Sequence, residues 1–219
     1  MAEASSKDKS ALGGYFLNAR ILYNIAIDAY RRARDRDSDE NVVCSDSLVA
    51  IVFAAASIEA FVNQIIVTGE IGPSLGRHGL AVLSRILKLL EKDAPVATKY
   101  ELVHLILTGD ACAKGERPYQ DLDVLITLRN WLAHMKPEPL DAVGVTRHLE
   151  NRQVLRPKKG NAIESQLGRL GTVDVARWAC DTAADVTQAI AKLFRSANDV
   201  QNQVLSTMFG GFDRIKDAE

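Results

Sequence analysis

The stretch from about Ser45 to Thr68 constrains the fold most, because almost every residue in it is apolar or small. Gly69, Gly72 and Pro73 follow it, and these residue types end helices. A helix that is apolar on most of its sides is stable only when other helices surround it. The sequence therefore predicts a helical bundle with this stretch in the middle.

The composition fits one helical domain. The chain has 219 residues, of which 47% are hydrophobic and 25% charged, so it can bury a substantial core. All six prolines lie between Pro73 and Pro157, which leaves both ends free of helix breakers. We expect a single all-α domain over residues 1–219, an up-and-down bundle of about five to six helices with a long C-terminal helix. Residues 137–171 are expected to form an irregular basic excursion.

The sequence predicts a cytoplasmic protein without a membrane segment. The N-terminus MAEASSKDKS is polar and lacks the apolar run of a signal peptide. The apolar stretch is interrupted by an acid and two amides, which disfavour a membrane span: Glu59, Asn63 and Gln64. The three cysteines are far apart and odd in number, as expected of reduced thiols: Cys44, Cys112 and Cys180.

Apolar periodicity predicts the other helices. They are expected over Ser10–Arg36, residues 75–92 and 96–108, a helix that begins near Pro118, and a short one around Val145–Arg152. The last helix begins at Thr172, a plausible N-cap. It carries a coiled-coil-like repeat: Ala176, Ala179, Ala183, Val186, Ile190, Leu193, Ala197, Val200 and Val204. The sequence does not decide whether this seam packs within the chain or against a second subunit.

A polar cluster interrupts the helix that begins near Pro118. Its apolar stripe has spacings of three and four: Leu122, Leu125, Leu128 and Leu132. Arg129 falls inside this stripe, roughly 20° from Leu122 around the helix. Because a guanidinium there needs an anionic partner, we predict that it pairs with Glu59; the alternative is that Glu59 reaches solvent at the edge of the bundle. Asn63 lies four residues after Glu59 and is expected to project into the interior with it.

The end of the same helix carries a recognisable motif. Arg129 is followed by Asn130 and, after three more residues, by His134, and Pro137 should stop the helix near Met135. This pattern resembles the R-x4-H motif of HEPN domains, a family named for nucleotide binding in higher eukaryotes and prokaryotes. Residues 56–64, ASIEAFVNQ, are similar to the helix with small residues, an acid and an amide that many HEPN domains carry upstream.

The resemblance implies a metal-independent endoribonuclease that needs no cofactor. In such an enzyme the 2′-hydroxyl of RNA attacks the adjacent phosphate and leaves a 2′,3′-cyclic phosphate and a 5′-hydroxyl. His134 would transfer the proton, Arg129 would stabilise the phosphorane, and Asn130 would orient either His134 or a phosphate oxygen, with Glu59 and Asn63 in support. The resemblance also implies a homodimer in a toxin–antitoxin or antiviral defence setting, with an antitoxin or another defence protein as a partner.

The motif poses a geometric difficulty. On a straight helix, Arg129 and His134 point roughly 140° apart. A long reach of the arginine, a distorted last turn, or two subunits that contribute to one cleft would each bring the two groups together.

Two basic segments are candidate RNA contacts. The densest basic patch follows the motif and is either a binding site for a phosphate backbone or a plain solvated loop; its RNA-binding residues would be Arg147, Arg152, Arg156, Lys158 and Lys159. His148 lies in the same patch and is interpreted as a surface residue. The arginines at the end of the first helix are interpreted as a solvated helix end: Arg31, Arg32, Arg34 and Arg36.

Three other classes compete with the nuclease. An inactive HEPN-like dimer would bind RNA, nucleotide or protein without turnover. A non-enzymatic interaction protein would recruit its partner through the C-terminal seam. A di-iron bundle would use the E-x-x-H spacing of Glu101 and His104, but the chain has no second E-x-x-H, and we predict no metal site.

Overall fold

A computed structural model describes the chain over six segments. These are residues 4–36, 45–70, 94–134, 144–156, 166–193 and 210–216, with only the backbone described at 4–17, 66–70 and 106. Every regular element in them is a helix, which confirms the all-α prediction: α1 (Ala4–Asp35), α2 (Ser45–Glu70), α4 (Val96–Thr108), α5 (Tyr119–His134), α6 (Val145–Asn151), α7 (Gln166–Leu170) and α8 (Val173–Leu193).

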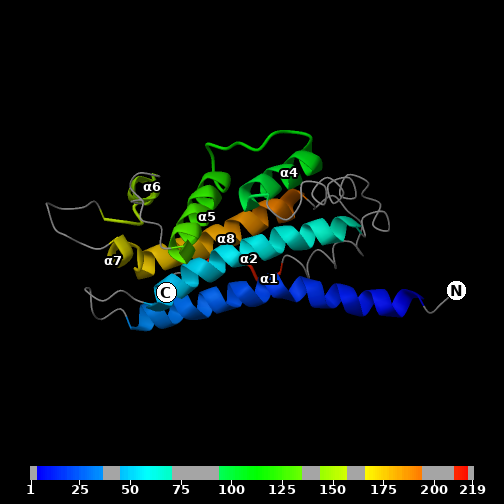
Figure 1. Cartoon of the computed structure of the whole chain (residues 1–219), viewed down its shortest axis with the longest axis horizontal. Helices are drawn as coiled ribbons and strands as arrows, with labels where there is room; N and C mark the ends of the chain where they lie inside the picture. Colours follow the sequence, from blue (N-terminus) through cyan, green and yellow to red (C-terminus); the bar gives the residue numbers. More distant parts are fainter. Residues whose placement is uncertain are drawn as a thin grey trace.

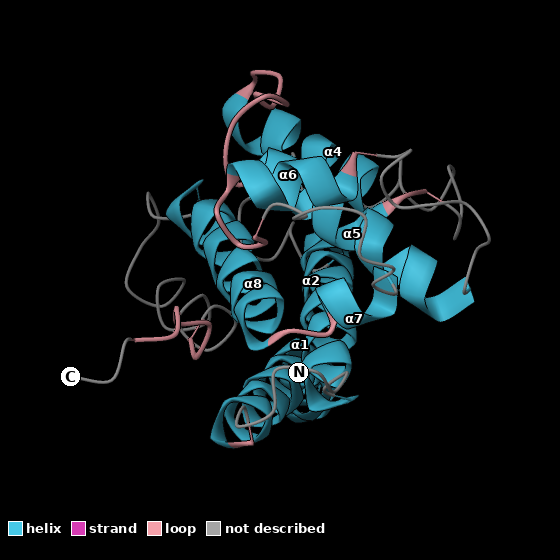
Figure 2. Cartoon of the chain, turned by 90° about the vertical axis from the view of Figure 1, so that its left-hand side faces the viewer, coloured by secondary structure: helices cyan, strands magenta, loops and turns pink. Residues whose placement is uncertain are grey.

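Helix α2 lies at the centre of the bundle, as its composition predicts. It runs antiparallel to α1, and α8 packs against both of them (Figure 1). Helices α4, α5 and α6 lie on the side of α2 away from α1 (Figure 2), and α4 and α5 contact α2 directly. The inner faces of α1 and α2 carry many alanines, which let the two backbones approach closely: Ala19, Ala26, Ala29, Ala33, Ala50, Ala54 and Ala55.

Helix α2 is also the one described helix that is long and apolar enough to cross a membrane. The window runs from Ser45 to Ile65, and 56% of it is buried inside the bundle. A central helix of a bundle has this composition because it is covered on most sides by other helices.

The apolar repeat of helix α8 packs within the chain over the part that the structure describes. Thr172 caps the helix, since its hydroxyl oxygen accepts a hydrogen bond from the Val175 amide at 3.3 Å. The first five seam positions are fully buried within the chain, where α8 packs on α2: Ala176, Ala179, Ala183, Val186 and Ile190. This part of the seam therefore packs inside the chain's own bundle. Ala197, Val200 and Val204 lie outside the described residues.

Helices α4 and α5 form a pair joined by the loop 109–118. Gly109 has a φ of 82° and ends α4, and its amide donates to the Leu105 carbonyl at 2.8 Å. Helix α5 buries Leu122, Leu125 and Leu128 completely, as the predicted stripe requires, while Leu132, the last member of the stripe, is only half-buried.

The segment 210–216 returns to the bundle and inserts one aromatic ring. Phe212 is 2% exposed, and its ring centroid lies 4.8 Å from that of Tyr23 and 5.7 Å from that of Phe61. The Tyr23 hydroxyl donates to the Asp213 carbonyl at 2.5 Å, and the Ile215 amide donates to the Asp181 carboxylate at 2.9 Å. We call this segment the C-terminal strap, because it is held to α1 on one side and to α8 on the other.

Some predicted boundaries differ from those observed. Helix α1 begins at Ala4 instead of Ser10, and α7 was not predicted, because the whole of 137–171 was expected to be irregular apart from a short helix now seen as α6. With α7, the described helices number seven, where five to six were expected. The helix predicted over residues 75–92 lies outside the described residues.

We expect Phe212→Ala to lower the free energy of unfolding by about 3–5 kcal/mol, because it leaves a cavity between two aromatic rings. Urea unfolding followed by circular dichroism measures this loss. Leu105→Ala removes a leucine of α4 that is 43% exposed and should change stability by far less, about 0.5 kcal/mol. Equal effects of the two substitutions would show that the strap contributes nothing to the core.

Candidate functional site

Arg129 is held between two acceptors on the α5 surface. Its guanidinium forms an ion pair with the Glu59 carboxylate of α2, and Nη1 donates to the Asn130 side-chain oxygen at 3.0 Å. The predicted pair between Glu59 and Arg129 is thus formed. The side chains are 38% and 24% exposed, so the pair lies at the edge of the bundle and not in its interior.

His134 occupies the last turn of α5, as predicted, and is exposed. Helix α5 is α-helical up to this residue, so the part of the last turn that is described is not distorted. The Arg129 guanidinium is directed to Glu59 and Asn130, and it makes no contact with His134 within the described chain. Within one subunit, the described residues therefore support neither a long reach of Arg129 toward His134 nor a distorted last turn of α5.

Asn63 is not where the sequence predicted it. It is exposed, and its side-chain oxygen accepts a hydrogen bond from Lys99 of α4 at 3.0 Å. The buried amide of α2 is instead the next residue, Gln64. The expectation that Asn63 projects into the interior with Glu59 is wrong, because a spacing of four residues leaves an offset of about 40° around the helix. At the edge of a bundle, that offset separates a half-buried position from an exposed one.

The predicted RNA-binding residues are divided by the structure. Arg147 on α6 and Arg156 after it are exposed, while Lys158 and Lys159 lie outside the described residues. Arg152 is half-buried, and its guanidinium donates to Asp121 and to Gln120, each at 3.1 Å. The Arg152 side chain therefore links α6 to α5, and this structural contact competes with any contact to RNA.

The strongest polar cluster among the described residues was missed by sequence analysis. Its centre is the carboxylate of Asp121 in the first turn of α5, whose side chain is only 6% exposed. Three groups surround this carboxylate: Arg117 at 3.0 Å, His148 at 2.6 Å and Arg152 at 3.1 Å. We call these four residues the Asp121 cluster. His148 is not the surface residue that was predicted, because it is largely buried between Asp121 and the ring of Trp178.

Part of this cluster carried a signal in the sequence. Arg117 and Asp121 have the spacing of an ion pair on adjacent helical turns, which a pattern search can find. His148 lies on α6 and Arg152 directly follows it, about thirty residues further along the chain, and only the packing of α6 on α5 brings them to Asp121.

The E-x-x-H pair of α4 takes part in local contacts. Glu101 accepts a hydrogen bond from Tyr119 and forms an ion pair with Lys114 at 2.8 Å. Burial opposes the ionisation of Glu101, but the contacts with Lys114 and Tyr119 lower its pKa overall. The His104 ring nitrogen lies 3.2 Å from the Asp110 carbonyl oxygen. No group of three or more potential metal ligands occurs within the described segments.

Comparison of the chain with protein-family models, curated proteins and solved structures found no match to any of the three.

We expect Asp121→Asn to lower the free energy of unfolding by about 3 kcal/mol, because it removes the buried carboxylate that the half-buried Arg152 and the largely buried His148 contact. Thermal and urea unfolding measure this loss. Asp123→Asn, two residues away on the exposed side of α5, is the matched control and should stay within about 0.5 kcal/mol of the wild type. If the two variants lose the same amount, the Asp121 cluster does not hold α6 on α5.

Proposed function

We propose that the chain is a metal-independent endoribonuclease of the HEPN type, with Arg129, Asn130 and His134 as its working residues. The observation that carries the proposal is the edge of α5, where Glu59 and Asn130 orient Arg129 and where His134 is exposed in the following turn. An oriented guanidinium and an accessible imidazole are the two groups that RNA cleavage by its own 2′-hydroxyl requires.

The proposed reaction is an intramolecular transesterification of the RNA phosphodiester. His134 accepts the proton of the 2′-hydroxyl, whose oxygen attacks the adjacent phosphorus. Arg129 stabilises the charge of the phosphorane, and the bond to the 5′-oxygen breaks. A proton returns to that oxygen, so the products are a 2′,3′-cyclic phosphate and a 5′-hydroxyl. Asn130 positions the Arg129 guanidinium, because its side-chain oxygen accepts a hydrogen bond from Nη1.

We propose a homodimer as the working form. Arg129 and His134 lie on different faces of a regular helix, and Arg129 is directed to Glu59 on the same subunit. A cleft formed by Arg129 from one subunit and His134 from the other brings the two groups to one phosphate without distorting α5. Arg147 and Arg156, which are exposed, and Lys158 and Lys159 are proposed to contact the RNA backbone.

The proposed setting is cytoplasmic RNA cleavage in a toxin–antitoxin or antiviral system, in which an antitoxin or another defence protein controls the enzyme. This setting rests on the resemblance of Arg129 to His134 and of residues 56–64 to HEPN domains.

A second candidate is a HEPN-like dimer without catalysis that binds RNA, a nucleotide or a protein. The ion pair between Glu59 and Arg129 favours this non-catalytic candidate, since Glu59 neutralises much of the charge with which Arg129 would stabilise a phosphorane.

We expect the purified wild type to cleave a mixed cellular RNA pool in EDTA and to leave 2′,3′-cyclic phosphate ends. His134→Ala and Arg129→Lys should each lower the cleavage rate by at least about a hundredfold, because proton transfer and charge stabilisation are each worth that much. Cleavage rates and end-group analysis of the products are the measurements.

His104→Ala is the matched control, since it removes a histidine outside the motif and should leave the rate unchanged. Full activity of His134→Ala would exclude the mechanism. If the wild-type protein is folded and dimeric but cleaves no RNA, the non-catalytic dimer becomes the better-supported hypothesis.

A mixed dimer tests whether two subunits share one cleft. Co-expression of Arg129→Lys and His134→Ala chains with different tags gives dimers in which one cleft contains both wild-type groups. A statistical mixture should therefore recover about a quarter of the wild-type rate, although each variant alone is inactive. Absence of recovery in purified mixed dimers would mean that both groups act within one chain.

A further inference from the structure

The C-terminal strap lies on the bundle in the manner of a bound peptide. Phe212 is its one buried residue, and the ring packs against Tyr23 of α1 and Phe61 of α2. Folded domains that recognise an extended peptide often hold it in this way, with an aromatic anchor in a pocket. We call the surface under the strap the strap groove, and its polar residues are Tyr23, Asp181, Asp185 and Gln188.

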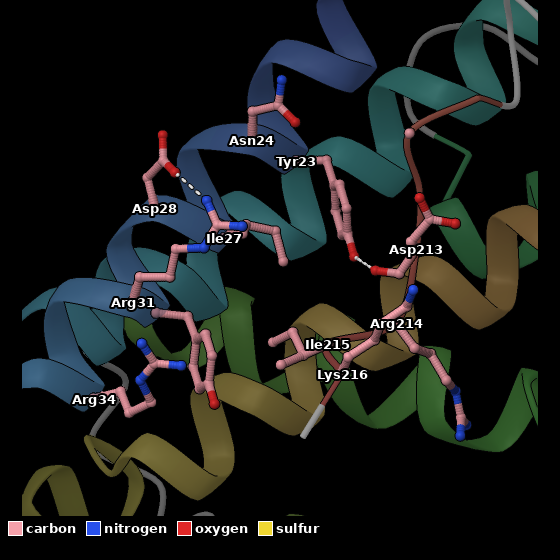
Figure 3. A pocket seen from close by; sticks show the side chains of 12 residues that line it. Tyr23, Asn24, Ile27, Asp28, Arg31, Arg34, Asp213, Arg214, Ile215 and Lys216 are labelled. Atoms are coloured by element: carbon pink, nitrogen blue, oxygen red, sulfur yellow. Dashed lines mark hydrogen bonds and ion pairs between the residues drawn. The ribbon is translucent and has the colours of Figure 1, made fainter. Parts of the chain in front are cut away.

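Side chains of α1 and α8 bind the backbone of the strap. Gln188 of α8 donates to the Phe212 carbonyl at 2.9 Å. The Tyr23 hydroxyl of α1 donates to the next carbonyl along the strap (Figure 3), and Asp181 of α8 accepts from the Ile215 amide. Hydrogen bonds to the backbone are available to any extended segment, so they give affinity, and the side-chain contacts give specificity.

Arg214 provides the second specific contact after the aromatic anchor. Its guanidinium forms a bidentate ion pair with Asp185 of α8, in which Nε lies 2.6 Å from one carboxylate oxygen and Nη2 contacts the other. The Arg214 side chain points away from α1 (Figure 3). Ile215, which follows it, is half-buried against the core. The strap groove therefore selects an aromatic residue, an arginine two positions later and then an aliphatic residue.

The strap does not fill the strap groove. A cavity of about 610 Å³ remains between α1 and the strap, and Figure 3 shows side chains of both around it. A second cavity of about 310 Å³ is lined by Arg214 and by residues of α5 and α8. A segment with one buried ring and cavities beside it can detach at a much lower free energy than the bundle unfolds. A bulkier segment in the same place would contact more of α1 than the strap does.

We propose that the strap groove is a docking site for a segment of a partner protein, and that the strap occupies this site in the free chain. The partner segment has the pattern that the groove selects: an aromatic residue, an arginine two positions later and an aliphatic residue directly after the arginine. Neither Arg129 nor His134 lines the cavity beside α1, so the site is separate from the proposed RNA-cleaving site.

The cavity beside α1 favours a partner protein over a second copy of this chain. A segment of the same chain competes at an effective concentration on the order of millimolar, so a displacing segment must make contacts that the strap lacks. A partner segment that also fills the cavity makes such contacts. The strap of a second copy would leave the same cavity open, and it would gain nothing over the tethered strap.

Fluorescence anisotropy of the full chain with a labelled peptide of residues 210–219 tests the proposal. The wild-type chain should bind this peptide weakly, because its own strap competes. Phe212→Ala in the full chain removes the anchor of that strap and should tighten peptide binding by at least about tenfold. Phe212→Ala in the peptide should weaken binding to this variant chain by at least about tenfold, because the aromatic anchor is lost.

Reversal of the ion pair between Arg214 and Asp185 tests the second contact without a cavity in the core. Asp185→Arg in the full chain repels the arginine of its own strap and so opens the groove. An Arg214→Asp peptide should bind this chain at least about tenfold more tightly than the wild-type peptide does. The order of the two peptides should be the opposite for the Phe212→Ala chain. If Phe212→Ala does not fold, the Asp185→Arg chain decides the question.

Arg214→Gln and Lys216→Gln in the full chain form a matched pair. Each removes one positive charge from an exposed residue of the strap. Arg214→Gln loosens the strap and should raise the affinity for the peptide by about threefold or more, since a bidentate pair is lost. Lys216→Gln should leave the affinity unchanged. His134→Ala should also leave it unchanged, which separates this test from that of the nuclease.

The proposal is overturned if neither the Phe212→Ala chain nor the Asp185→Arg chain binds its matching peptide at millimolar concentration. It is also overturned if binding is insensitive to both substitutions in the peptide. Mixing of Asp185→Arg chains with Arg214→Asp chains tests exchange of the strap between two copies. If mixed dimers form in preference to dimers of either variant and the free peptides do not bind, the strap is exchanged between copies and the assignment to a partner protein is wrong.

Discussion

The structure depends on the need to cover an apolar helix on most of its sides. Helix α2 has α1, α4, α5 and α8 around it, and alanines let its neighbours approach closely. Even its buried Ser57 is satisfied within the helix, by the Ala54 carbonyl at 2.7 Å. A core helix of this kind has no room for a reactive group in its middle. The charged side chain of Glu59 therefore lies at the edge of this helix, where it meets Arg129.

This arrangement explains why the candidate site lies at the end of α5. The first half of α5 is held by buried leucines and by the Asp121 cluster. Its second half carries Arg129 at the edge and His134 in the exposed last turn. A rigid helix that is anchored at one end and exposed at the other presents polar groups in a fixed geometry, which a positioned substrate requires.

Sequence analysis succeeded where the determining interactions are local. The bounds of the helix over residues 96–108, the N-cap at Thr172 and the α5 stripe follow from capping, glycine and periodicity. The ion pair of Glu59 with Arg129 was predicted across 70 residues because each of two charges at a helix interface required a partner.

Sequence analysis failed where packing brings distant residues together. His148 and Arg152 reach Asp121 only because α6 packs on α5, and the strap reaches α1 only after the chain has completed α8. Asn63 was misplaced because periodicity gives the spacing of residues around a helix but not the rotation of the helix in the bundle. The HEPN resemblance rests on sequence motifs alone, since the comparisons found no match.

The position of Phe212 has a consequence for how the protein is made. The ring of Phe212 covers Tyr23, and the two are joined through Asp213 by a contact that spans 190 residues. A ribosome releases Tyr23 long before Phe212, because the two are far apart in the chain. Helices α1 and α2 can pair while synthesis continues, but the surface under the strap stays exposed to water and to chaperones until the strap has been made. The docking of the strap therefore follows the pairing of α1 and α2, and a truncated chain that lacks the strap would display this surface permanently.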